Sequence, residues 1–152
     1  MTVVLDAYAV LALLKGEPAA PSVRELIEVG DGVLTCLGVA EVLDHLVRIV
    51  GVTEEEAALD VAQMGLSNPP LLDAGVALKS GFLRARHYHR RTCAVSLADC
   101  VAAETARTLS TSLATSDPHL LDLCRREGID LLPLPDSRGT SWSPEPPVPG
   151  AR

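Results

Sequence analysis

The sequence predicts an α/β domain built on a short, mainly parallel sheet of about five strands. Short apolar runs alternate along the chain with stretches of helical apolar periodicity. Strands that alternate with helices pair in parallel through right-handed crossovers. Aromatic residues make up only 3% of the chain, which favours aliphatic helices packed on a sheet over an aromatic-rich β-sandwich.

Length and composition predict one globular domain. The chain has 152 residues, of which 47% are hydrophobic and 22% are charged, enough to bury a sizeable core. We expect the domain to span residues 1–134. Residues 135–152 are expected to form a proline-rich tail with little fixed structure, because the region from Pro133 has no apolar periodicity. No membrane span or signal peptide is recognisable, so we expect a cytoplasmic protein.

In the first half of the chain, each expected element is bounded by a residue that starts or stops it. Asp6 ends the first apolar run and can cap the helix after it, and glycines end each of the next helical patterns. Thr53 and Glu56 have the spacing of a capping box. The expected elements are a strand over 2–5, helices over 10–14 and 23–27, a strand over 33–35, an amphipathic helix over 38–50 and a helix from 53.

In the second half, acids and a serine mark the helix starts. Asp73 can cap one helix, Ser96 and Asp99 have the spacing of a capping box, and Asp117 precedes a proline at a first helical position. The expected elements are a strand over 69–72, a helix from 73 into a basic cluster, a helix from 96, a strand over 112–115, a helix over 117–128 and a strand over 129–132.

Four carboxylates are expected to share one crevice. Asp6, Asp99 and Asp117 each lie at a helix start, and Glu41 is expected in the first turn of the 38–50 helix, beside its apolar stripe. The carboxyl ends of parallel strands meet at one edge, where ligands bind. Each acid also has a simpler interpretation as a cap or a first-turn charge. Capping and ligand binding are compatible, so the simpler interpretation does not exclude a site.

Such a cluster requires protons or cations. Two carboxylates about 4 Å apart repel by roughly 4 kcal/mol at an effective dielectric constant near 20. The candidate ligands are all oxygens, without His or Cys at metal-ligand spacing, so the expected ion is Mg²⁺ or Mn²⁺. Hard divalent ions held by carboxylates suit phosphate chemistry, in which they activate water and stabilise the leaving oxygen.

The charge balance argues against a generic nucleic-acid coat. The formal net charge is −7 at pH 7, whereas non-specific nucleic-acid binding needs excess cations. One basic cluster is present, and it is either a solvated helix end or a contact for RNA phosphates; its arginines are Arg84, Arg86, Arg90 and Arg91. The four cysteines lack C-x-x-C spacing and are expected to be buried free thiols.

The ordered acids resemble the acidic quartet of PIN-domain proteins, and more narrowly that of the VapC-like ribonuclease toxins of type II toxin-antitoxin pairs. The resemblance covers about residues 2–134. It implies a three-layer α/β/α fold, divalent-metal-dependent endoribonuclease activity, a small antitoxin partner and a homodimer. The motifs that carry it are Val4-Leu5-Asp6-Ala7, Val39-Ala40-Glu41-Val42-Leu43, Ser96-Leu97-Ala98-Asp99 and Thr115-Ser116-Asp117.

The resemblance also implies a role for each acid. Asp6 and Asp99 would be the principal metal ligands, Asp117 would complete the cluster, and Glu41 would hold an ion or orient the attacking water. The hydroxyls of Ser96 and Thr115 would support these ligands. The sequence departs from the common pattern after Asp6, where Ala7 and Tyr8 replace the small hydroxyl residues often found there.

Two other functions remain open at this point. The first is a catalytically weak module with the same fold that binds RNA or protein. The second is a phosphatase or phosphotransfer domain in which Asp6 would be the nucleophile. That chemistry usually needs a second acid close behind the first and a placed lysine, whereas the only lysines are Lys15 and Lys79.

Overall fold

A parallel sheet of four short strands forms the centre of the structure, a computed structural model that describes residues 1–145. The strand order is β2-β1-β3-β4, and every neighbouring pair is parallel. Val4 in the middle of β1 pairs with Val33 on one side and Leu113 on the other. The strands are β1 Val3–Leu5, β2 Gly32–Leu34, β3 Ser112–Thr115 and β4 Leu131–Pro133.

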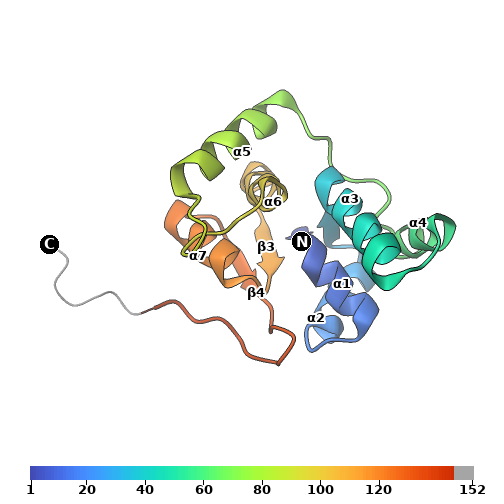
Figure 1. Cartoon of the computed structure of the whole chain (residues 1–152). Coiled ribbons are helices and arrows are strands. Elements are labelled where there is room, and N and C mark those ends of the chain that lie inside the picture. Colours follow the sequence, from blue (N-terminus) through green and yellow to red (C-terminus); the bar gives the residue numbers. More distant parts are fainter. Residues whose placement is uncertain (146–152) are drawn as a thin grey trace, which may run out of the picture.

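Helices cover both faces of this sheet (Figure 1). The α-helices are α1 Ala7–Lys15, α2 Ala20–Glu28, α3 Cys36–His45, α4 Glu54–Gln63, α5 Ala74–His87, α6 Leu97–Thr108 and α7 Pro118–Glu127. A π-helical turn, η1 Leu46–Val50, continues α3 as far as Gly51. None of the helices within residues 1–145 is both long enough and apolar enough to cross a membrane.

Successive side chains along each strand point to opposite faces of the sheet, and the core therefore has two parts. Val3 and Leu5 pack with α1 to α4 in one apolar cluster, while Val4 between them packs with α5 to α7 in the other. On β3, Leu113 and Ala114 likewise belong to different clusters. Successive strand side chains point to opposite faces, so both faces of the sheet are covered. The predicted three-layer α/β/α fold is confirmed.

The strand predicted over residues 69–72 is wrong. This segment forms part of the connection between α4 and α5. Pro69 and Pro70 have no backbone N–H to donate to a neighbouring strand. The side chain of Leu71 is 87% exposed, so the apolar run that predicted a buried strand does not enter the core. The described part of the chain therefore has four strands instead of about five.

The helix that carries Glu41 begins earlier than predicted. Thr35 caps α3 by accepting a hydrogen bond from the Gly38 N–H at 3.0 Å, so the helix starts at Cys36. Glu41 therefore lies in the second turn, beyond the stabilising effect of the helix N-terminus that a first-turn acid would have. The four cysteines are free, as predicted. Cys36 differs from the expectation because it is exposed.

The first residues of the predicted tail pack against the domain. Leu134 is buried, and the Asp136 carboxylate accepts hydrogen bonds from the N–H groups of Arg138 and Thr140, both at 2.9 Å. The Trp142 indole N–H donates to Asp122 on α7 at 3.2 Å. The expectation of little fixed structure is therefore wrong over residues 136–142. Residues 146–152 of the predicted tail lie outside the described residues.

An ion network fixes α6 against its neighbours. Glu127 at the end of α7 accepts hydrogen bonds from His87 on α5 and from Arg107 on α6, the latter at 2.8 Å. Burial alone would raise the pKa of Glu127, but the hydrogen bonds from His87 and Arg107 lower it to about 2. The ionised carboxylate thus holds three helices together.

We expect Gly38→Ala to destabilise the fold. An added Cβ would lie 2.5 Å from Cδ1 and 2.9 Å from Cγ of Leu34, a side chain that is only 1% exposed. Overpacking of this kind costs about 1–3 kcal/mol. Urea denaturation measures the change. Gly81→Ala on α5 is the matched control, because its added Cβ meets no atom within 4 Å and alanine favours a helix by about 1 kcal/mol. If Gly38→Ala were as stable relative to the parent as Gly81→Ala is, this packing argument would be refuted.

Candidate active site

The topology brings the four predicted acids to one edge of the sheet. Asp6 follows β1 and caps α1, and Asp117 follows the neighbouring strand β3 and caps α7. The helix α6 leads back to the start of β3, so its N-terminus, with Asp99, lies at the carboxyl edge of the sheet. Glu41 comes from α3, which follows β2 at the same edge.

Asp6 is the most buried of the four. Its side chain is 4% exposed. One carboxylate oxygen, Oδ1, accepts the Ala9 N–H at 2.7 Å, and the other, Oδ2, accepts the Thr115 hydroxyl. Thr115 in turn accepts the Asp117 N–H at 3.0 Å. This buried hydroxyl therefore links the ends of the two central strands and connects two of the acids.

Asp99 forms the predicted capping box. Its N–H donates to the Ser96 hydroxyl at 3.0 Å, and its Oδ2 accepts the Ser96 N–H at 2.7 Å. Asp117 also caps its helix, since its Oδ1 accepts the His119 N–H at 2.8 Å. Within residues 1–145, the second oxygen of each of these two carboxylates makes no hydrogen bond. Capping thus leaves each of them an oxygen for a ligand.

The pKa directions show that the acids act on one another. Burial, helped by the negative charges of Asp99 and Asp117, raises the pKa of Asp6 to about 7 against the opposing effect of hydrogen bonds from Thr115 and Ala9. The pKa of Glu41 is raised by partial burial and by the charge of Asp99.

Asp99 lies at the centre of this coupling. Burial raises its pKa, hydrogen bonds from Ser96 lower it, and the charge of Asp117 raises it. Asp99 also raises the pKa values of Asp6 and Glu41. Each of the other three acids is therefore coupled to Asp99. Crowded carboxylates with raised pKa values favour a bound proton or cation.

The donor chemistry fits a hard divalent ion. Among residues 1–145, no three His, Cys, Asp or Glu side chains form a ready group for a metal ion. Mg²⁺ does not require such a group, because it usually keeps several waters and takes one or two carboxylates from the protein. The unpaired oxygens of Asp99 and Asp117, two partly buried side chains at this edge of the sheet, are of the chemical type that could serve as such ligands.

Two of the four arginines in the basic cluster are engaged within the protein. Arg84 donates to the Val95 carbonyl at 2.9 Å, and its guanidinium lies 4.1 Å from the ring centroid of Tyr88. Arg86 forms an ion pair with Glu127 at 3.5 Å. Arg90 and Arg91 are exposed, and neither forms an ion pair with another described residue. They are the members of the cluster best placed for an external phosphate.

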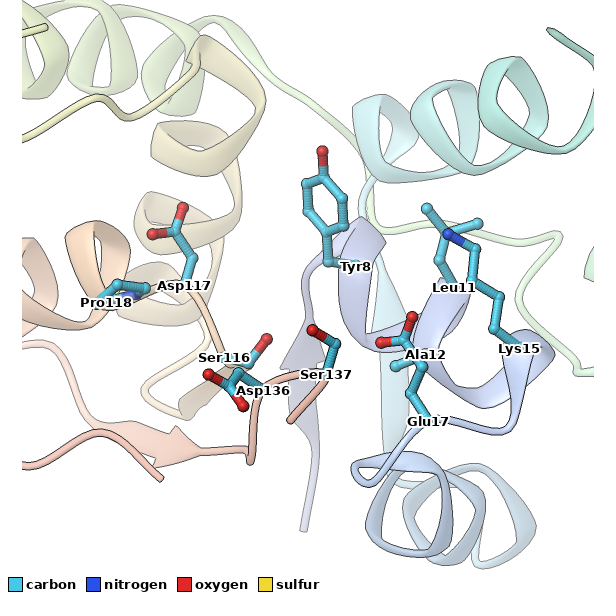
Figure 2. A pocket seen from close by; sticks show the side chains of 10 residues that line it. All are labelled: Tyr8, Leu11, Ala12, Lys15, Glu17, Ser116, Asp117, Pro118, Asp136 and Ser137. Atoms are coloured by element: carbon cyan, nitrogen blue, oxygen red, sulfur yellow. The ribbon is translucent and has the colours of Figure 1, made fainter. Parts of the chain in front are cut away.

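Two hollows are each lined by one of the four acids, and neither is lined by Asp6 or Asp99. A hollow of about 470 Å³ is lined by Asp117, Lys15 and residues of the loop after β4 (Figure 2). A smaller hollow of about 170 Å³ is lined by Glu41, His45 and Arg48. Sequence reasoning missed the loop after β4, which reaches the larger hollow through Asp136 and Ser137. The only signal in that loop is Asp136-Ser137-Arg138-Gly139, which is typical of a turn.

The family model of the PIN domain matches residues 3–126, which include all four acids. The chain belongs to the PIN domain family. This result confirms the resemblance in the acidic motifs. It also agrees with the parallel sheet and its helical layers.

Two solved structures share the PIN fold with this chain. The structure of VapBC2 from Rickettsia felis, bound to a DNA fragment from their promoter, is 15% identical with a TM-score of 0.61 and covers 87% of this chain and 98% of that chain. The structure of FitAcB from Neisseria gonorrhoeae is 17% identical to this chain, with a TM-score of 0.62. The match covers 86% of this chain and 96% of that chain. At these identities the likeness shows the fold alone. No curated protein matches this PIN domain.

We expect Asp6 to make metal-free protein less stable as pH rises. Its pKa is about 7 in the folded state, against 3.8 for an ordinary aspartate, so the folded state holds a proton that the unfolded chain loses. The free energy of unfolding therefore falls between about pH 4 and pH 7. In urea denaturation with a chelator, Asp6→Asn should reduce this fall by about 1 kcal/mol or more. The same pH dependence in both proteins would show that Asp6 titrates normally.

Proposed function

We propose that this PIN domain is a divalent-metal-dependent endoribonuclease, and that it is the toxin of a toxin-antitoxin pair. The observation that carries the proposal is the coupling of Asp6, Glu41 and Asp117 to Asp99 at one edge of the sheet. Membership of the PIN family supports the hydrolytic class, because PIN domains are generally nucleases. Mg²⁺ or Mn²⁺ is the proposed cofactor, since the donors are carboxylate oxygens.

Each acid has a proposed part in the reaction. Asp99 and Asp6 are the principal ligands, and Asp117 completes the set. Asp6 is held by Ala9 and Thr115, so it is pre-oriented for this role. Glu41, which is less buried, is placed to hold an ion or orient the attacking water. A bound divalent ion would lower the pKa of that water and offset charge on the phosphate.

A small antitoxin encoded beside this chain is the proposed partner. The similar structure from Rickettsia felis is described as VapBC2 bound to a fragment of promoter DNA, which supports a DNA-binding partner for this chain as well. We also propose a homodimer and a cytoplasmic location. A short neighbouring reading frame with a DNA-binding N-terminus would support the toxin role.

A catalytically weak binding module is the second candidate. It is favoured by one observation, that no group of three His, Cys, Asp or Glu side chains in the described residues is ready to hold a metal ion. Such a module would bind RNA or a protein partner without cleaving RNA. Cleavage that stops when a chelator is added, and returns with Mg²⁺ or Mn²⁺, separates the enzyme from this alternative.

We expect Asp99→Asn to abolish RNA cleavage while the fold is kept. Asparagine can still accept a hydrogen bond from the Ser96 N–H, so the capping box loses little. Cleavage of labelled RNA is the readout, and circular dichroism checks the fold. Asp130→Asn, at an exposed acid outside the cluster, is the matched control and should cleave like the parent. A fully active Asp99→Asn protein would leave Asp99 with the role of a cap alone.

We expect the parent protein to bind Mn²⁺ through the same acids. Calorimetric titration of chelator-treated protein should show heat of binding in the parent and in Asp130→Asn. Asp99→Asn should show a large loss of Mn²⁺ affinity, because it removes the carboxylate that is coupled to the other three. Absence of Mn²⁺ uptake by the parent would count against the metal site and favour the binding module.

A further inference from the structure

An exposed tyrosine lies directly beside the acids. Tyr8 follows Asp6 by two positions in the first turn of α1, and its side chain is 64% exposed. The residues on either side of it, Ala7 and Ala9, are buried. The helix therefore turns the aromatic ring outward while it anchors the backbone beneath it. Few side chains in this chain offer a ring to a ligand, since only 3% of residues are aromatic.

The ring of Tyr8 borders both hollows. It lines the larger hollow together with Asp117, and it lines the smaller hollow together with Glu41. In Figure 2 its side chain rises between Asp117 on one side and Leu11 and Lys15 on the other. A ligand that reached from one acid-bearing hollow to the other would thus pass the face of this ring.

The groups that line the hollows suit nucleotides. The larger hollow contains Lys15 and the hydroxyls of Ser116 and Ser137, which can bind phosphate or sugar oxygens, beside the carboxylates of Glu17, Asp117 and Asp136. His45 lines the smaller hollow, and its Nε2 is buried without a hydrogen-bond partner among the described residues. The smaller hollow is mainly polar, because Glu41, Asp44 and Arg48 also line it. A protein-docking patch would instead be expected to be mainly apolar at its centre.

Stacking of a base on Tyr8 would also contribute to RNA binding in spite of the negative net charge of the chain. The chain carries a formal charge of −7, so phosphate contacts alone would give weak RNA binding. Stacking of a base on an aromatic ring needs no cation and tolerates any sequence, because every base has a π face. A base inside a duplex is covered by its neighbours, so only an unpaired base can reach such a ring.

We propose that Tyr8 binds single-stranded RNA by stacking on a base beside the cleaved phosphodiester, with the flanking nucleotides in the two hollows. This inference rests on the proposed nuclease function, and it makes Tyr8 a substrate-binding residue that selects unpaired RNA. The ring sets the position of the chain relative to Asp99 and Asp117. Lys15, Ser116 and Ser137 receive the nucleotide on one side, and the smaller hollow receives the nucleotide on the other.

Binding to a cleavage-deficient protein tests the proposal. In the Asp99→Asn background with Mg²⁺, fluorescence anisotropy measures the affinity for a short single-stranded oligoribonucleotide. Adding Tyr8→Ala should weaken binding by roughly 5- to 150-fold, the effect of losing one stacked base. The slope of affinity against salt should not change, because no phosphate contact is lost. Tyr8→Phe, which keeps the ring, should restore the affinity.

Phe82→Ala is the matched control. Phe82 is an aromatic residue of similar exposure, 57%, but it lies on α5 in a hollow that contains none of the four candidate acids. Its removal should leave the affinity unchanged. A duplex of the same sequence should bind equally well to proteins with and without Tyr8→Ala.

The outcomes separate this inference from the proposed function. If the parent cleaves RNA but Tyr8→Ala binds and cleaves single strands normally, the stacking role is refuted and the nuclease stands. If RNA binds through Tyr8 but the parent cleaves nothing, the nuclease proposal fails and the stacking role is kept. If Tyr8→Ala weakens binding of a protein partner and leaves RNA binding unchanged, the surface is a protein interface and the stacking role is refuted.

Discussion

The buried contact between Asp6 and Thr115 is the interaction on which the candidate site depends. It joins the carboxyl ends of β1 and β3, the two central strands. Burial of a carboxylate is costly unless hydrogen bonds satisfy it, and here Ala9 and Thr115 each supply one. The same Thr115 hydroxyl holds the backbone of Asp117. A single threonine therefore positions two acids and sets the edge of the sheet at which Asp99 joins them.

The four acids affect the stability of the fold in two opposite ways. Three of the acids take part in helix capping, Asp6 and Asp117 as N-caps and Asp99 in a capping box, and a cap stabilises its helix by about 1 kcal/mol. Their grouping acts in the other direction, because burial and mutual repulsion raise the pKa values of Asp6, Glu41 and Asp99. A set of ordinary caps would be more stable if spread apart. Strain of this kind is typical of sites that bind a cation or carry out chemistry.

Much of this structure could be predicted from the sequence because its signals are local. Asp6, Ser96 and Asp117 mark helix starts by capping chemistry that involves residues at most three positions away. The errors have local causes too. Pro69-Pro70 looked like a strand because apolar residues follow, yet strand formation needs a partner edge and N–H donors. Contacts over long distances, such as the approach of Asp136 to Asp117 around one hollow, leave no periodic signal in a single sequence.

The segment after β4 belongs to the part of the chain that forms the candidate site. Asp136 and Ser137 form part of the wall of the larger hollow, and Trp142 fastens the following residues to α7. Truncation at residue 134, where the composition changes, would leave the four candidate carboxylates in place but would open that wall to solvent. Residues 136–142 are thus better regarded as part of the wall of the candidate site than as an appendage to the domain.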